Sequence, residues 1–157
     1  MDMSHPFLTT TADLAARIGE ELGTSNWITL DQARIGEFAE CTGDAQWIHV
    51  DVERSRRESP FGAPVAHGYL TLALVAPTSL SILMASATPK QVLNYGLEKV
   101  RFLAPVRSGK RVRNRIKLLS VDDKGAGRVV VTTENTIEIE GEDKPALIAV
   151  ALVMLMG

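Results

Sequence analysis

The spacing of apolar residues changes at Pro89, and this change limits the possible folds more than any other feature of the chain. From Gly68 to about Ala85 the residues are apolar nearly all round a helix, which predicts a helix buried on most sides. Pro77 is expected to break or kink this helix, because its ring removes a donor and clashes with the preceding turn. After Pro89 the apolar residues alternate, as in strands with one buried face. The order predicts an α+β fold in which a curved antiparallel sheet wraps around one central buried helix.

Four alternating segments supply the expected strands. The first covers residues 92–103, where Gly96 is typical of a bulge. Glycine-containing turns separate the later strands, and the last strand runs to Met156. The residues expected to share the inner faces of the two middle strands are Val112, Asn114, Ile116 and Leu118, and then Val129, Val131, Thr133, Ile137 and Ile139.

Two helices are expected in the first half of the chain. The first begins at Thr11 or the residue before it, carries Leu14, Ile18 and Leu22 on one face, and ends at Gly23. The second is short and amphipathic. A chain of 157 residues with 45% hydrophobic residues can bury one real core, so we expect a single domain.

The ends of the second helix are marked by local signals. Thr29 and Gln32 fit a capping box, in which each side chain bonds the backbone of the other. Gly43 suits the left-handed position that ends a helix. Cys41, the only cysteine, excludes an internal disulfide and is expected to face the core in the last turn.

The stretch Thr42-Gly43-Asp44-Ala45-Gln46-Trp47-Ile48-His49 is the segment best suited to chemistry. Asp44 and His49 lie beyond the helix, on an expected loop that can turn both side chains inward. Such a carboxylate and imidazole can hold one water and move its proton without a metal. The spacing alone also fits a surface Asp44 that caps the next turn and an unrelated, half-buried His49.

The residues around this pair resemble the motif of the MaoC-like or type 2 enoyl-CoA hydratase family. That motif is an aromatic residue leading to Gly-Asp-x-Asn-Pro-aliphatic-His, with a small residue six positions further on. Gln46-Trp47 replaces the usual Asn-Pro, as in the branch that contains nodulation protein N. The matching residues are Gly43, Asp44, Ile48, His49 and Ser55.

Two later segments extend the resemblance to about residues 27–156. The segment 65–70 resembles the entrance to the family's central helix, and 100–109 resembles a strand and turn common to hot-dog folds. The resemblance implies a single hot-dog domain over 1–157, with a helical extension over about 1–26.

The resemblance also implies an activity, an (R)-specific enoyl-thioester hydratase or 3-hydroxyacyl-thioester dehydratase of fatty acid metabolism. Asp44 and His49 would activate the water that adds to trans-2-enoyl-CoA. The first amides of the helix at Gly68 would stabilise the enolate oxygen, because the positive end of the helix dipole lies there. Gln46 and His67 would position the substrate or the loop. Many family members carry a serine where this chain has Ala76.

Partners follow from the same reading. We expect an acyl-CoA or acyl carrier protein thioester as substrate, no cofactor and no metal, and a homodimer or larger assembly, because one short chain leaves sheet edges uncovered. Arginines can pair with the phosphates of coenzyme A, although solvated surface charge is as good an explanation for any one residue. The candidates are Arg54, Arg56, Arg57, Lys99, Arg101 and Arg107.

Composition leaves few other classes. A net charge of -2 gives no general attraction to nucleic acid or membrane, and no signal peptide is visible, so we expect a cytoplasmic protein. Two alternatives stay open. A hot-dog acyl-CoA thioesterase shares the fold but does not require the Asp44–His49 spacing. A non-catalytic acyl-thioester-binding subunit fits Ala76 and the Gln46-Trp47 departure.

Overall fold

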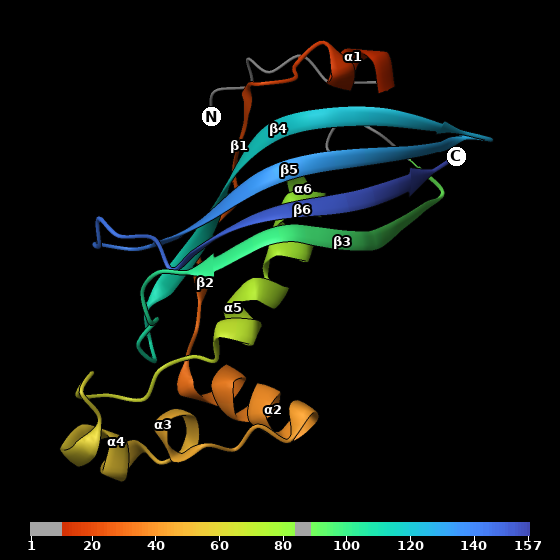
Figure 1. The fold of residues 1–157 in the computed structure, drawn as a ribbon. Helices are drawn as coiled ribbons and strands as arrows, with labels where there is room; N and C mark the ends of the chain where they lie inside the picture. Colours follow the sequence, from red (N-terminus) through yellow and green to blue (C-terminus); the bar gives the residue numbers. More distant parts are fainter. Residues whose placement is uncertain (1–10, 84–88) are drawn as a thin grey trace.

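The structure, a computed structural model, describes residues 11–83 and 89–157. A long curved sheet arches over the paired central helices, and a group of three helices lies beyond one end of them (Figure 1). The helices are α1 (Thr11–Ala15), α2 (Gln32–Thr42), α3 (Trp47–Val50), α4 (Val52–Glu58), α5 (Gly68–Ala73) and α6 (Val75–Leu83). The strands are β1 (Glu21–Thr24), β2 (Ile28–Thr29), β3 (Gln91–Phe102), β4 (Arg111–Gly125), β5 (Arg128–Ile139) and β6 (Leu147–Met156).

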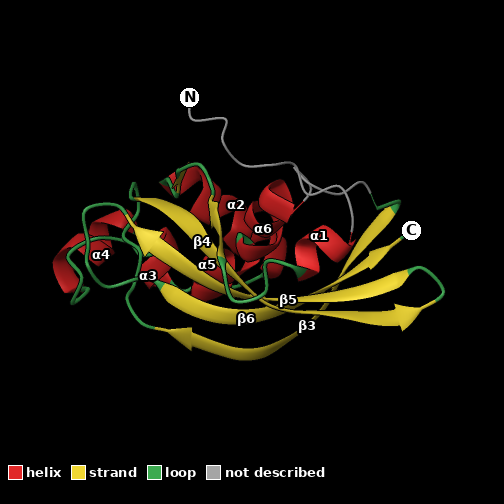
Figure 2. Ribbon diagram, turned by 90° about the horizontal axis from the view of Figure 1, so that it is seen from above, coloured by secondary structure: helices red, strands yellow, loops and turns green. Residues whose placement is uncertain are grey.

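The sheet is antiparallel throughout, in the order β1-β4-β5-β6-β3, with β2 also pairing to β4. Figure 2 shows the strands curving around the helices, which lie on one side of the sheet. The pairing of β3 with β6 shifts register between Asn94 and Gly96, which confirms the predicted bulge. The predicted arrangement of a curved antiparallel sheet around a central helix is therefore confirmed.

The inner face of β4 is as the sequence predicted. Val112, Asn114, Ile116 and Leu118 are all buried, and most of the predicted β5 positions are buried as well. Alternation places every second side chain on the helix side, and the apolar ones form the core with α5 and α6.

One inner position of β4 is polar, and its side-chain N–H groups find partners within the core. The Asn114 amide donates to Thr78 Oγ1 and to Asn135 Oδ1, both at 2.9 Å. The Ser79 hydroxyl donates to the same Asn135 oxygen at 2.7 Å. This network joins helix α6 to strands β4 and β5 by directional bonds in addition to apolar packing.

The central helix breaks as predicted, but one turn before Pro77. Helix α5 ends at Ala73 and α6 begins at Val75. The proline has no N–H to bond the carbonyl four residues earlier, which belongs to Ala73, and its ring crowds that carbonyl. The expected end near Ala85 lies outside the described residues.

The predicted first helix is wrong beyond its first turn. Helix α1 stops at Ala15, Ile18 is exposed, and Leu22 is buried as part of strand β1. The amide of Gly19 donates to the Leu118 carbonyl, which starts the pairing of this segment with β4. Pairing with β4 satisfies the backbone hydrogen-bonding groups of this segment. That gain outweighs the weak helical preference indicated by three apolar residues at helical spacing.

The predicted capping box of the second helix is also wrong. Thr29 belongs to strand β2, and the N-cap of α2 is Asp31, whose carboxylate accepts from the Arg34 amide at 2.9 Å. At the other end Gly43 takes the left-handed conformation, with φ of 81°, as predicted. Cys41 is exposed instead of core-facing, because the buried stripe of this helix is formed by residues on its other face.

Candidate active site

The structure brings the predicted acid–base pair together. Asp44 follows the glycine that ends α2, whereas His49 lies in the short helix α3 and not on a loop. Helix α3 forms because the Gln46 carbonyl accepts from the His49 and Val50 amides. One ligand-type atom from each of Asp44, His49 and His67 lies within 4.8 Å of the other two. A third side chain, His67, therefore joins the pair.

The tautomer of His49 is set by its surroundings. The ring is 6% exposed, and its Nδ1 lies 2.6 Å from the Val65 carbonyl oxygen. A carbonyl can only accept, so Nδ1 carries the proton and Nε2 keeps a free lone pair. Within the described residues Nε2 has no protein hydrogen-bond partner. His49 is thus oriented as a base, with its acceptor nitrogen available to a ligand or a water.

Gln32 is a site residue that the sequence reasoning missed. Its side-chain amide, on helix α2, donates to the backbone carbonyl of His49 at 2.7 Å. This hydrogen bond ties the backbone of α3 to α2. The residue was assigned to a local capping box, and no local signal distinguishes that role from a contact 17 residues away. The Gln46 side chain is exposed and bonds neither His49 nor another described residue.

His67 touches both members of the pair. It is 2% exposed, and its Nε2–H donates to the backbone carbonyl of Asp44 at 2.8 Å. Its ring stacks on His49 with centroids 3.8 Å apart and planes inclined by 24°. Phe38 packs against the His67 ring, with centroids 4.9 Å apart. The remaining nitrogen, Nδ1, is buried without a hydrogen-bond partner.

The three residues Asp44, His49 and His67 have the composition of a metal site. Nδ1 of His49 and Nε2 of His67 are already bonded to carbonyl oxygens, so each ring has one nitrogen left. The remaining nitrogen of His67 is buried, and Nε2 of His49 is the one available to a bound water beside Asp44.

The polar segment that follows His49 begins with helix α4. Ser55 is fully buried there, and its hydroxyl donates to the Trp47 carbonyl at 3.2 Å. The site has no room for a larger side chain, which explains a small residue six positions after His49. Arg54 lies over the Trp47 ring at 4.3 Å, so the tryptophan that replaces proline packs the dyad segment against α4.

The arginines of helix α4 are already paired with carboxylates. Arg54 contacts Glu58 at 2.9 Å, Arg56 contacts Glu53 at 2.9 Å, and Arg57 lies 4.0 Å from Glu58. All of these side chains are largely exposed, so the pairs are easily exchanged for a ligand phosphate.

The other three cationic candidates lie elsewhere. Lys99 and Arg101 alternate along β3 with Val100 and Phe102, whose side chains face the helices, so the two cations lie on the outer face of the sheet. Arg107 pairs with Val65, two residues before His67. No ion pair involves these three cations in the described part of the chain, and Arg107 is the one next to the site.

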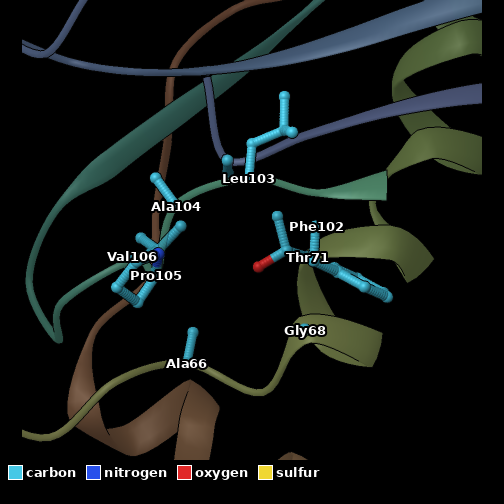
Figure 3. Close-up of a pocket in the computed structure, with 9 residues that line it drawn as sticks. Ala66, Gly68, Thr71, Phe102, Leu103, Ala104, Pro105 and Val106 are labelled. Atoms are coloured by element: carbon cyan, nitrogen blue, oxygen red, sulfur yellow. The ribbon is translucent and has the colours of Figure 1, made fainter. Parts of the chain in front are cut away.

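The entrance of helix α5 borders a cavity of about 280 Å³ (Figure 3). Gly68 begins the helix, and within the described residues neither its amide nor that of Tyr69 has a partner. A Cβ on Gly68 would lie 3.0 Å from the Phe102 ring, which lies close beside it (Figure 3). The cavity is lined by Ala66, Gly68, Thr71, Phe102, Leu103, Ala104, Pro105, Val106 and Ala146.

A second cavity, of about 420 Å³, follows the first along the central helices. It is bounded by Leu72 next to Thr71 of the first cavity, and its walls are mostly apolar. Ala76 is one of its walls, so the position of the expected family serine is apolar here. The full lining is Leu72, Ala73, Val75, Ala76, Ser79, Asn94, Tyr95, Gly96, Leu97, Ala151, Leu152 and Val153.

A curved antiparallel sheet around a central helix, with an Asp–His pair at the helix entrance, defines a protein of the hot-dog class. The chain belongs to the family described as the MaoC like domain, whose model matches residues 13–140. The predicted family is thereby confirmed. In the described residues, no helix is both long and apolar enough to cross a membrane.

Relatives of known name agree with this assignment. Nodulation protein N of Rhizobium leguminosarum bv. viciae is 49% identical over 138 residues, covering 88% of this chain and 86% of that protein. The 3-hydroxyacyl-thioester dehydratase Z of Mycobacterium tuberculosis is 47% identical over 142 residues, covering 90% and 93%. Both are similar over nearly their whole length.

Solved structures share the architecture. A monoamine oxidase regulatory protein from Archaeoglobus fulgius superposes with a TM-score of 0.76 at 25% identity, over 88% of this chain and 90% of that one. The (R)-hydratase from A. caviae involved in PHA biosynthesis gives 0.72 at 20% identity, over 88% and 96%. At that identity the second likeness shows the fold alone.

Proposed function

We propose that this protein is an (R)-specific enoyl-thioester hydratase that also runs in reverse as a 3-hydroxyacyl-thioester dehydratase. The observation that carries the proposal is the pairing of Asp44 with His49, whose Nδ1–H bond to Val65 leaves Nε2 free as a base. The relative from M. tuberculosis, named a 3-hydroxyacyl-thioester dehydratase, supports the same reaction class.

The reaction follows from the positions of these groups. Nε2 of His49 takes a proton from a water that the Asp44 carboxylate orients, and the water oxygen forms a bond to C3 of the enoyl thioester. The electron pair of the C2–C3 double bond moves toward the thioester carbonyl, giving an enolate. The proton held by the dyad then passes to C2, so one water has been added. Acid–base groups of this kind supply typically about 10²–10⁴-fold in rate.

The developing enolate oxygen needs donors that are already in place. The Gly68 and Tyr69 amides have no partner within the described residues, and they lie at the entrance of α5 beside the first cavity. Absence of a side chain at Gly68 lets a thioester approach these amides closely. We assign them the stabilising role in the proposed reaction.

The substrate class follows from the two cavities. Their mostly apolar walls suit an acyl chain that extends from the dyad along the central helices. We propose a thioester of coenzyme A or of acyl carrier protein as the substrate. Phosphate contacts would come from Arg107 and from the exposed α4 arginines, and Lys99 and Arg101 are weaker candidates because they lie on the outer face.

We also propose that the protein is a single hot-dog domain that works as a homodimer in the cytoplasm. Strand β3 ends the sheet, and Leu93, Tyr95 and Leu97 on it are 51%, 58% and 50% exposed. An unpaired strand edge with apolar side chains is a surface for another chain. The exposed free thiol of Cys41 is typical of a reducing compartment.

The dimer is tested by light scattering at micromolar concentration. Wild-type protein should have twice the mass of one chain, and Leu97→Lys should shift it toward the monomer by placing charge on the β3 edge. Lys117→Glu, a change in an exposed residue of β4, serves as the control. A wild-type monomer would contradict the proposed assembly.

The activity is tested by incubating the purified protein with crotonyl-CoA and following the enoyl absorbance. Loss of absorbance without release of thiol is the expected result. Release of free thiol would instead show a thioesterase. Binding without turnover would show an acyl-thioester-binding subunit, the reading that Ala76 favours.

A further inference from the structure

His67 is buried, ionisable and unused by the proposed reaction, which makes it the group in the molecule that most needs an explanation. It comes from the residue before α5, whereas Asp44 and His49 come from the segment after α2. Burial of an imidazole with one nitrogen unpartnered costs stability. A group kept at such a cost has a purpose that packing alone does not supply.

We propose that His67 is a positioning residue that fixes Asp44 and His49 relative to each other, an inference that rests on the proposed function. Its Nε2–H bond to the Asp44 carbonyl, at 2.8 Å, holds the backbone that carries the carboxylate. Its ring, stacked on His49 at 3.8 Å, sets the plane in which the His49 lone pair points. One side chain thereby restrains both members of the pair.

The bonds around the two rings define one tautomer for each. His67 bears its proton on Nε2, and His49 bears its proton on Nδ1, because both partners are carbonyl oxygens that cannot donate. In the neutral rings the lone pair therefore lies on Nδ1 of His67 and on Nε2 of His49. With His67 neutral, His49 takes up the proton of the water without repulsion from a like charge.

His67 also starts helix α5, whose first amides are the proposed donors to the enolate oxygen. The His67 carbonyl accepts from the Leu70 and Thr71 amides and starts the helix, and Gly68 follows directly. The same residue thus connects the dyad to the amides assigned to the enolate oxygen. A displacement of His67 would move the base, the carboxylate and the oxyanion donors together.

Two substitutions separate the hydrogen bond from the stack. His67→Gln keeps an amide donor near the position of Nε2 but removes the ring, and His67→Phe keeps a ring but removes the donor. Each should lower kcat for crotonyl-CoA hydration by about tenfold, the scale of one well-placed hydrogen bond, with KM within about twofold. In an Asp44→Asn background, His67→Phe should cost less than about twofold more, because the carboxylate it positions is already gone.

Phe38→Leu is the matched control, since Phe38 packs on the same ring but makes no hydrogen bond or ring stack with Asp44 or His49 in the described structure. It should lower Tm as the His67 variants do and leave kcat within about twofold. If Phe38→Leu lowers kcat as much as the His67 variants, or if His67→Phe costs the same fold in both backgrounds, His67 has only a structural role and the proposal is wrong.

The tautomers of His49 and His67 can be measured by NMR, which tests the positioning role without an activity assay. The chain has 3 histidines, so ¹⁵N imidazole spectra of the wild-type protein can be assigned by substitution. We expect His67 protonated on Nε2, His49 protonated on Nδ1, and loss of the single His49 tautomer in His67→Gln. The opposite tautomer of His67 in the wild type overturns the proposal even if no variant folds. Locked tautomers in a protein that does not hydrate crotonyl-CoA would reject the proposed function and leave the positioning role standing.

Discussion

Asp44 and His49 are five residues apart, yet their side chains meet because α3 intervenes as a single helical turn. In a continuous helix side chains at this spacing would diverge. The Gly43 cap ends α2 before Asp44, and the Gln46 carbonyl begins α3 before His49. The site therefore depends on two changes of backbone direction within six residues, each caused by an identifiable cap.

The dyad should act as one unit. Asp44→Asn keeps size and hydrogen bonding but removes the carboxylate, and His49→Gln removes the imidazole. Each change should lower kcat for crotonyl-CoA hydration by about 10²–10⁴-fold, and the double change should cost little more. Initial rates on folded protein, verified by circular dichroism, check this. Near-normal turnover of Asp44→Asn would exclude the mechanism.

Gly68→Ala should damage catalysis more than stability. The new Cβ would lie 3.0 Å from the Phe102 ring, but that side chain is 52% exposed and can rotate away. The methyl group would then stand between the thioester and the free amides. We expect Tm within a few degrees of wild type and kcat/KM lower by about tenfold or more. Gly36→Ala in α2, where a Cβ meets nothing within 4 Å, is the control. It should leave kcat/KM unchanged and raise Tm slightly, because alanine favours a helix interior over glycine.

In the proposed reaction, the elements around the central helix would decide which acyl chains fit. Ala76→Phe on α6 should fill much of the second cavity while leaving the first cavity, beside Gly68, open. Each methylene that loses an apolar contact costs about 0.8 kcal/mol. We therefore expect kcat/KM for a dodecenoyl thioester to fall at least about tenfold, while that for crotonyl-CoA stays within about twofold.

The comparison across chain lengths is made by competition in one mixture. Ala16→Phe, at an exposed alanine after α1, serves as the matched control and should change neither substrate. An equal loss for both chain lengths would show that Ala76 affects the dyad and not the acyl space.

Elements with local signals could be predicted from the sequence, and those decided by distant contacts could not. The inner face of β4, the bulge at Gly96 and the Gly43 cap each follow from a pattern within a few residues. Strand β1 depends on a free edge of β4 nearly a hundred residues later. The bond from Gln32 to His49 and the stack of His67 on His49 likewise join segments that no local pattern relates. The motif therefore indicated the proposed catalytic pair but not the contacts that hold it.

Across the whole molecule, the outer face of the sheet carries a ladder of ion pairs. Partial burial raises the pKa of Glu138, but hydrogen bonds from Arg113 and Arg115 outweigh burial and hold it below its ordinary value. The bond from Arg111 likewise lowers the pKa of Glu140. Carboxylates with lowered pKa stabilise the fold above their unfolded pKa, and this contribution is lost as the pH falls through the folded value.

Glu138→Gln should accordingly destabilise the protein at pH 7 by about 1 kcal/mol, because the pairs are only partly buried and solvent still weakens them. The difference from wild type should shrink as the pH falls from the ordinary pKa of a glutamate through the lower pKa of folded Glu138. Urea unfolding at several pH values measures it. Glu134→Gln on the same strand, with no ion pair in the described structure, is the control. A difference that grows toward acid pH would contradict the ion-pair explanation.

The two edges of the sheet are unequal. On one side the sheet ends in β1 and β2, which have 4 and 2 residues, and on the other it ends in β3, which has 12. A chain that could join at both edges would grow without limit into a filament, whereas one with a single long edge stops after joining one copy across a twofold axis. In the proposed assembly, the short strands β1 and β2 would thus favour a closed dimer over a filament.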